Sequence, residues 1–206
     1  MIKRPPASLI VAVLCTLVLL GCANVIPGRG TPPKLFSLSP KSTYSAGLPT
    51  VNWQLVVELP FTAETLDTPR IALSRDRYTL DYYGNARWSE RTPVMIQTLL
   101  VESFENTGKI VAVARQATDL RADYVLKTDL REFQAELSDG GLPTARVRIN
   151  AKLVKMPERT IIASFKAERA VEAEGPELLQ VVHAFDTALG KVLKRVVEWA
   201  LKAPGG

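Results

Sequence analysis

The chain has 206 residues, of which 47% are hydrophobic and 23% charged, a composition typical of globular proteins rather than of disordered or collagen-like ones. Its 26 basic and 21 acidic residues give a formal net charge of +5. The charges are scattered rather than gathered in blocks, which argues against a nucleic-acid-binding patch. The two cysteines are Cys15 and Cys22, and the one histidine is His183. A disulfide within the body of the protein is therefore excluded, and a metal site is not expected.

The first 22 residues predict a secretory signal. Lys3 and Arg4 precede an apolar run from Leu9 to Leu20, after which a small residue, Gly21, precedes Cys22. A helix made of this run covers about 18 Å, well short of the roughly 30 Å hydrocarbon core of a bilayer. We therefore expect cleavage of the signal rather than a membrane span, which leaves 24 basic against 21 acidic residues.

The tetrapeptide Leu19-Leu20-Gly21-Cys22 resembles the lipobox of bacterial lipoproteins. The resemblance implies cleavage between Gly21 and Cys22, a diacylglyceryl group on the Cys22 thiol, and an N-acyl chain such as palmitate on its freed amine. Two or three such chains hold a protein stably on a bilayer, whereas one binds only marginally. The alternative is an uncleaved membrane anchor running from Leu9 to Ile26.

The residue after the lipidated cysteine also carries a sorting signal in this resemblance. It is Ala23, whereas an Asp there marks retention in the inner membrane. The implied location is the periplasmic face of the outer membrane of a Gram-negative bacterium, with the lipid on Cys22 as the attachment to the bilayer.

The chain therefore divides into four segments. Residues 1–21 form the signal peptide, 22–34 the lipidated cysteine with a Pro/Gly-rich tether, 35–202 a single domain, and 203–206 a flexible tail. A domain of roughly 170 residues is long enough to bury one sizeable core.

Alternating or β-branched apolar residues predict seven strands. They are expected at Leu35–Leu38, Gln54–Leu59, Arg70–Ser74, Tyr78–Tyr83, Tyr124–Glu136, Ala145–Met156 and Thr160–Ala170. The alternation is clearest in Ala145–Met156, where a polar residue follows nearly every apolar one, so one face of this strand should be solvated. Short turns around it suggest that the last three strands form an antiparallel meander.

Two helices are expected. The first spans Val94–Asn106, with Thr92 as N-cap, Pro93 at the first helical position and Gly108 as the glycine that follows its end. The second opens at Gly175-Pro176. Its apolar residues recur at intervals of three and four, at Leu178, Val182, Phe185, Leu189, Val192, Val196 and Trp199.

This recurrence in the second helix permits two interpretations. It is compatible with a coiled coil, which would make the protein a homo-oligomer. Because Leu179, Leu193 and Val197 widen the apolar stripe, we favour a long amphipathic helix that packs on its own sheet. The fold class predicted is α+β, with one mostly antiparallel or mixed sheet and two main amphipathic helices on one face.

The sequence shows no catalytic signature. It lacks a Gly-rich phosphate loop, an HExxH motif and a Gly-x-Ser-x-Gly elbow, and no nucleophile is placed by sequence beside His183. Carboxylate pairs such as Glu102 and Glu105 are more simply interpreted as solvated surface groups. We predict a protein that is not an enzyme and has no cofactor besides the lipid on Cys22.

A cluster of aromatic and basic residues is the candidate binding site. Tyr82, Tyr83, Arg87 and Trp88 lie close together in the sequence, and aromatic and Arg side chains are the usual anchors of protein interfaces. The alternative is that one tyrosine alternates into the core, Trp88 fills the space between sheet and helix, and the arginines are merely solvated.

The body of the chain also resembles the ABC-type transport auxiliary lipoprotein family, which includes the PqiC-like outer-membrane lipoproteins that accompany MCE-domain lipid transporters. The most specific match is the run Tyr82-Tyr83-x-x-Ala86-x-Trp88 before the Pro-initiated helix. The other matching segments are Leu35–Leu38, Leu55–Pro60, Arg70-Ile71, Leu80–Trp88, Ala122–Leu126, Leu130–Phe133 and Ala184–Leu189.

The resemblance implies a non-enzymatic periplasmic component of a system that transports lipids or other hydrophobic compounds. The expected partner is the system's MCE-domain protein, which works from the inner membrane with an ATPase and a permease. Cys22 is the one functional residue carried over. Three alternatives stay open: an outer-membrane assembly or lipopolysaccharide-transport lipoprotein that partners a β-barrel, a lipid-modifying hydrolase, and direct lipid binding between helix and sheet.

Overall fold

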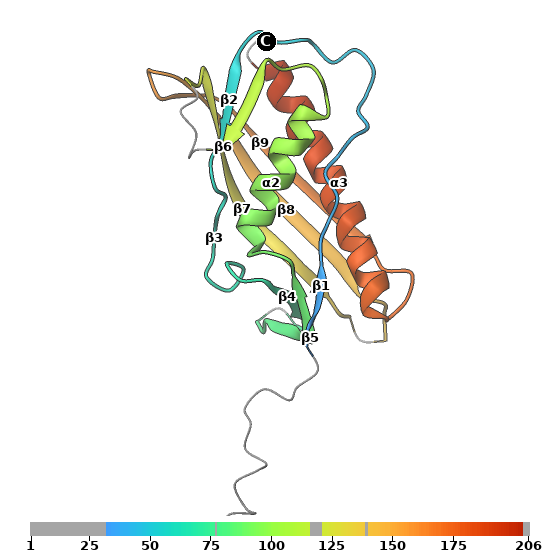
Figure 1. Cartoon of the computed structure of the whole chain (residues 1–206). Coiled ribbons are helices and arrows are strands. Elements are labelled where there is room, and N and C mark those ends of the chain that lie inside the picture. Colours follow the sequence, from blue (N-terminus) through green and yellow to red (C-terminus); the bar gives the residue numbers. More distant parts are fainter. Residues whose placement is uncertain (1–31, 77, 116–120, 139, 204–206) are drawn as a thin grey trace, which may run out of the picture. The chain divides into compact units, whose positions relative to one another are not determined.

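The computed structural model describes residues 32–76, 78–115, 121–138 and 140–203. Within these ranges a mixed sheet and two helices form one domain (Figure 1). The helices are α2 (Thr92–Glu105) and α3 (Leu178–Lys202), and the strands are β1 (Lys34–Phe36), β2 (Gln54–Val57), β3 (Phe61–Thr62), β4 (Arg70–Ser74), β5 (Asp81–Trp88), β6 (Ala112–Arg115), β7 (Tyr124–Glu136), β8 (Thr144–Lys155) and β9 (Thr160–Glu172). The predicted α+β class is confirmed.

The long strands β7, β8 and β9 pair antiparallel along almost their whole lengths, which confirms the predicted meander. Alternation in β8 decides its two faces, because successive side chains of a strand point to opposite sides. Val147, Ile149 and Leu153 are fully buried, whereas Arg146, Arg148 and Asn150 between them keep some exposure. One face of the meander therefore belongs to the core and the other is open to water.

The second edge of β7 makes the sheet mixed. Three short strands pair with it in parallel, one after another along its length: β2 at Leu55 opposite Tyr124, β3 at Phe61 opposite Asp129, and β4 at Ala72 opposite Gln134. β6 adds to β2 at one end of the sheet, while β5 and β1 add to β4 at the other. One edge of β7 therefore carries separate groups of short strands, whereas β8 and β9 continue the sheet on its other edge (Figure 1).

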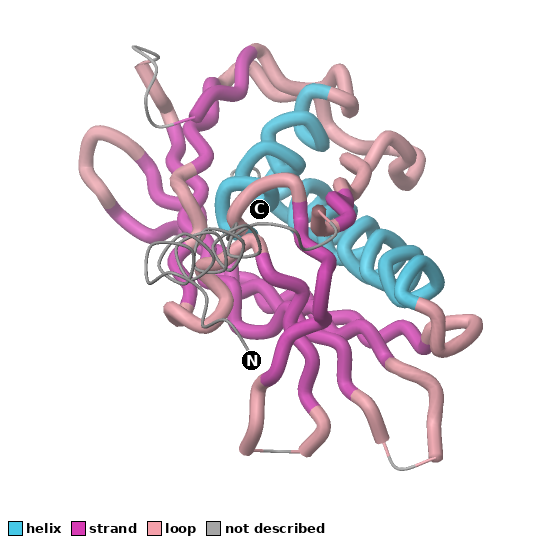
Figure 2. Tube along the Cα trace, turned by 60° about the horizontal axis from the view of Figure 1, so that its bottom comes forward, coloured by secondary structure: helices cyan, strands magenta, loops and turns pink. Residues whose placement is uncertain are grey.

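Helix α3 lies on the core face of the sheet. Its contacts are with β8, β9 and α2. The residues of the expected apolar stripe are buried: Val182, Phe185, Leu189, Val192 and Val196. The stripe therefore packs within the chain, which is the interpretation we favoured over a coiled coil. Figure 2 shows both helices on one side of the strands. Leu179 departs from the expected stripe, because it is 58% exposed in the first turn.

The start of α3 is stabilised locally. Glu177 is the N-cap, and its side chain and that of Gln180 each bond the backbone N–H of the other. Such a reciprocal pair satisfies two of the N–H groups that the first turn of a helix leaves unpaired. The helix therefore begins two residues after the expected Gly175-Pro176 opening.

Helix α2 is covered on both sides. The sheet lies beneath it, and the segment of residues 37–53 crosses over it and α3. The backbone N–H of Lys41 donates to Ser103 Oγ on α2 at 2.9 Å, and those of Ser39 and Ser45 donate to Asp186 and Glu198 on α3, each at 2.7 Å. The segment of residues 37–53 accounts for the burial of α2 on more than one face.

Some expected details at α2 differ in the structure. Thr92 is not the N-cap: Arg91 holds that position, and the Thr92 hydroxyl donates instead to the carbonyl of Thr68 at 2.9 Å. The expected glycine at the other end is confirmed, since Gly108 has a φ of +59°, a value that side chains disfavour.

The strand prediction also needs correction. The strand expected at Tyr78–Tyr83 lies instead at Asp81–Trp88, and β3 and β6 have no counterpart in the sequence prediction. Both missed strands are short and pair with partners distant in sequence, so local pattern does not reveal them. Cys22, the cleavage site and residues 204–206 of the tail lie outside the described residues. Neither described helix is long and apolar enough to cross a bilayer.

Candidate functional site

The candidate aromatic site lies on β5, at the end of the domain where β1 begins (Figure 1). The structure places Trp88 in the core: its side chain is 1% exposed, and its ring centroid lies 5.6 Å from that of Phe133 and 5.3 Å from that of Phe185. The prediction of Trp88 as a partner-binding residue is therefore wrong. The ring fills the space between the sheet and α3, where aromatic pairs add to the stability of the core.

Tyr82 and Tyr83 are both half-buried. The Tyr82 hydroxyl donates to the carbonyl of Thr65 at 2.9 Å, and the Arg70 guanidinium lies 3.7 Å from its ring centroid, a cation–π arrangement. Burial raises the pKa of Tyr83, while the charge of Arg75 lowers it. Each tyrosine thus has one face packed on the domain and another face accessible.

A bulge in β5 gives this region its shape. Arg70 pairs with Arg87, and Ala72 pairs with Tyr82. A spacing of two residues on β4 is therefore matched by a spacing of five residues on β5, and the extra residues of β5 form the bulge. Asn85 in the bulge has a φ of +53°, a conformation that Asn adopts more readily than most residues. Local signals for such a bulge exist in the Gly84-Asn85 dipeptide.

The bulge lines a concavity of about 480 Å³ that joins two of the predicted site residues to others outside the predicted set. Tyr83 and Arg87 line it together with Pro33, Arg70 and Asn85. Tyr82 and Trp88 are not among the residues that line it. The candidate site is therefore smaller than predicted and centres on two arginines and one tyrosine, beside the point where the chain enters the domain.

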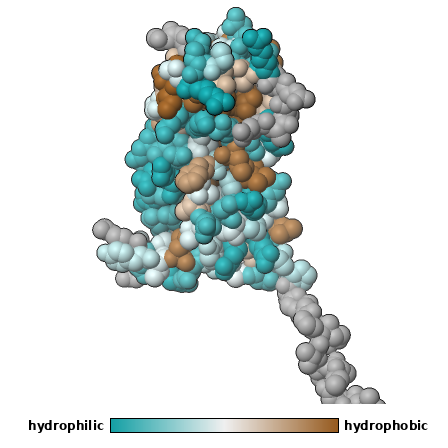
Figure 3. Space-filling model, turned by 90° about the vertical axis from the view of Figure 1, so that its left-hand side faces the viewer, coloured by the Kyte–Doolittle hydropathy of each residue, from teal (hydrophilic) through white to brown (hydrophobic). Residues whose placement is uncertain are grey.

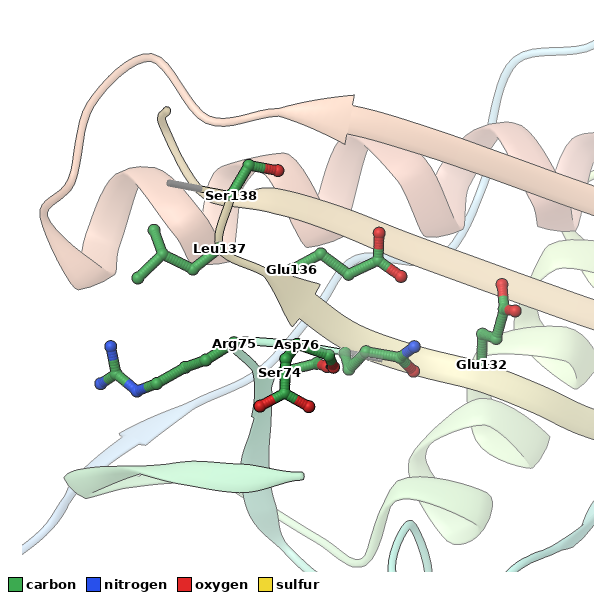
Figure 4. A pocket seen from close by; sticks show the side chains of 8 residues that line it. Ser74, Arg75, Asp76, Glu132, Glu136, Leu137 and Ser138 are labelled. Carbon is green, nitrogen blue, oxygen red and sulfur yellow. The ribbon is translucent and has the colours of Figure 1, made fainter. Parts of the chain in front are cut away.

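A second concavity, of about 510 Å³, lies nearby on the water-facing side of β7 (Figure 4). Its carboxylates Glu132 and Glu136 are held by Arg148 and Arg146, at 2.7 and 2.9 Å. Figure 4 shows Arg75 extending away from both. Carboxylates that are already paired with arginines in this way are not free to act as the acid or base of a catalytic step.

The third carboxylate of that concavity, Asp76, accepts hydrogen bonds within a turn. The Thr79 hydroxyl and the backbone N–H groups of Tyr78 and Thr79 donate to it, and these bonds hold its pKa below the usual value. His183 is exposed on α3. Among the described residues, no group of three or more His, Cys, Asp or Glu side chains is placed to hold a metal ion.

The comparisons with known proteins agree with this architecture. The sequence pattern of the family described as ABC-type transport auxiliary lipoprotein component matches residues 35–197. The chain belongs to this family. The description names an auxiliary transport component and not a catalyst. The family membership expected from the Tyr82–Trp88 run and its companion segments is thereby confirmed.

A solved structure supports the assignment. The protein XCC0632 from Xanthomonas campestris, a DUF330 family member, is 31% identical and superposes with a TM-score of 0.79 over 84% of this chain and 97% of its own. A second solved protein shares the fold alone, with 10% identity and a TM-score of 0.65 over 82% of this chain and 99% of its own.

A curated relative is longer than this chain. The Bradyrhizobium diazoefficiens protein bll6063 is 26% identical over 121 residues, which are 59% of this chain and 32% of that protein. The chain thus aligns with about a third of that relative's length.

Proposed function

We propose that this family member is a lipid-anchored protein on the periplasmic face of the outer membrane, and that it docks the periplasmic part of an ABC transport system there. The observation that carries the proposal is the family match over residues 35–197, combined with the lipobox-like Leu19–Cys22 ahead of it. Its partner is the MCE-domain protein of the system, and its cargo is a lipid or another hydrophobic compound.

The geometry supports a binding role in preference to a catalytic one. The carboxylates at the concavity beside β7 are engaged in ion pairs or a turn, and the exposed His183 has no carboxylate or nucleophile bonded to it among the described residues. We also propose that the remaining residues of the predicted site contact a partner near the start of the domain. These residues are Tyr82, Tyr83 and Arg87.

Anchoring is tested by Cys22→Ala in the full-length chain. Without the thiol no diacylglyceryl group can be attached, so the protein should lose the outer-membrane fraction and appear uncleaved or in the periplasm. Wild-type protein is followed in the same gradients, and mass spectrometry of its N-terminal peptide identifies the lipid. An outer-membrane fraction unchanged by Cys22→Ala would refute the lipid anchor.

Docking is tested by co-purification of the lipidated protein with the MCE-domain protein of the same bacterium. Recovery of that protein from cross-linked envelopes supports the proposal. Recovery of an outer-membrane β-barrel in its place would favour the assembly or lipopolysaccharide-transport alternative.

A further inference from the structure

The water-facing side of the sheet carries a line of apolar side chains at the end away from β1. Ala114, Val56, Val125, Val154 and Ile161 are successive register partners across β6, β2, β7, β8 and β9, and we name these five the apolar row. At about 4.8 Å per strand the row is roughly 19 Å long.

The row lies on the face opposite the helices. Val56, Val125 and Val154 form a cluster separate from the main core, whereas their chain neighbours Leu55, Leu126 and Leu153 belong to that core. Arg115, the neighbour of Ala114, reaches Thr98 on α2 at 2.7 Å from the other side. The row is thus an apolar patch on a face that is otherwise charged.

Four residues of the row, all except Ala114, line a concavity of about 550 Å³. The three valines are 4–8% exposed and Ile161 is 54% exposed, so the floor is closely packed and one side is open. Met156 is half-buried beside the valines. Figure 3, which views the side where β2 and β6 lie in Figure 1, shows hydrophobic groups near the upper end set among hydrophilic ones.

Positive charge lines the same concavity. Lys127 bonds Glu58 at 3.1 Å, and Lys152 is the register partner of Lys127 on β8. Lys152 and Arg159 have no ion-pair or hydrogen-bond partner for their side chains in the described part of the chain. Three cations and one carboxylate thus surround the apolar row, an excess that favours an acidic occupant.

The open side argues for a protein segment over a free lipid. Sites for small apolar ligands bury most of the ligand surface, which a concavity open on one side of a sheet does not do for an acyl chain. A protein segment brings apolar groups of its own. The site also lies far from the end of the sheet that holds β4, β5 and β1, since nine residues of β7 separate Val125 from Gln134 beside β4, about 30 Å of strand.

We propose that the apolar row, with Lys127, Lys152 and Arg159, is the docking surface for a partner segment that carries carboxylates beside apolar side chains. The inference rests on the proposed function, because it assigns this surface to the transporter's periplasmic component. It places a contact with the transporter at the end of the domain away from β1.

The experiment measures binding of the isolated periplasmic part of the MCE-domain protein to the mature chain and its variants. Ile161→Asp places a charge on the open side of the row and should weaken binding about tenfold or more. The double variant Lys152→Glu/Arg159→Glu should weaken it about tenfold at low salt. Wild-type binding should also weaken as ionic strength rises, because salt screens the attraction between exposed opposite charges, with a Debye length of about 10 Å at 0.1 M.

Matched controls come from α3. Leu179→Asp changes an aliphatic side chain with 58% exposure, close to that of Ile161, and Lys191→Glu reverses an exposed cation with no partner among the described residues. Both should bind as wild type does. Thermal melting of each variant shows whether it is folded.

The outcomes separate this inference from the proposed function. If the row variants bind as wild type while Arg87→Glu does not, the transporter docks at the tether end and the inference is wrong, but the proposed function stands. If wild-type protein does not bind, both fall. The inference also fails if Ile161→Asp abolishes binding of a fluorescent fatty acid or self-association while leaving binding of the MCE-domain protein unchanged.

Discussion

The inner and outer faces of β7, β8 and β9 differ in what their side chains contact. On the inner face, Val147, Ile149 and Leu153 pack without exposure beneath α3. On the outer face, charged side chains pair with one another over the half near β4, as in Arg148–Glu132 and Arg146–Glu136, and the apolar row occupies the other half. The arginines and glutamates of that half form ion pairs with one another, whereas Lys152 and Arg159 beside the row have no partner among the described residues.

The two faces therefore contribute differently to the stability of the fold and to what the protein binds. Apolar burial on the inner face contributes most of the stability, and exposed ion pairs on the outer face contribute little. Substitutions of the inner face should therefore unfold the protein, whereas substitutions of the outer face should leave it folded and change, at most, what it binds.

The largest expected effect is in the core between α3 and the inner face. Phe185 contacts both Trp88 and Phe133 and is fully buried, so Phe185→Ala should lower the free energy of unfolding by about 3–5 kcal/mol because it leaves a cavity. Urea denaturation followed by tryptophan fluorescence measures this. His183→Ala, at an exposed position of the same helix, should change stability by less than about 0.5 kcal/mol. Equal effects would show that burial against the inner face is not the main source of stability.

A smaller effect is expected in the charged half of the outer face. Arg148 and Glu132 are 34% and 22% exposed, and pairs of this kind couple by about 0.2–1 kcal/mol. A double-mutant cycle with Arg148→Ala and Glu132→Ala measures the coupling. It should shrink as salt is raised. A coupling of several kcal/mol would show that this half of the face stabilises the fold as the core does.

The smallest expected effect is the pH response of the turn after β4. Hydrogen bonds from Thr79 and Tyr78 hold the pKa of Asp76 below its usual value. A carboxylate with a lowered pKa stabilises the folded turn above its unfolded pKa, and that contribution is lost as pH falls through the folded value. NMR titration of the Asp76 carboxyl should give a midpoint below that of an unstructured aspartate. A midpoint at the ordinary value would show that the turn is not held by these bonds.

The sequence predicts elements well where one residue type alternates strictly or follows the helical period. The alternation of Ala145–Met156 and the seam of α3 give nearly correct bounds, because the period of a half-buried strand or helix is a local property. Thr92 shows where a local pattern misleads. A Thr before Pro93 is a typical cap, but its hydroxyl donates to Thr68, a residue distant in the chain.

The candidate site is predicted only in part for the same reason. Tyr83 and Arg87 line a concavity together, but so do Pro33 and Arg70, which the β1–β5 and β4–β5 pairings bring there. Trp88 has the composition of an interface anchor, and nothing local distinguishes that role from core packing. Its burial depends on Phe133 and Phe185, which lie far along the chain.

By itself the sequence determined the lipobox-like Cys22, the family and the α+β class, because each depends on neighbouring residues or on a local period. Only the tertiary structure decided which side chains meet on the outer face. Ala114, Val56, Val125, Val154 and Ile161 form a row because four strand registers align them. Register is set by long-range pairing and by which face is buried, and neither is written in any short stretch of the chain.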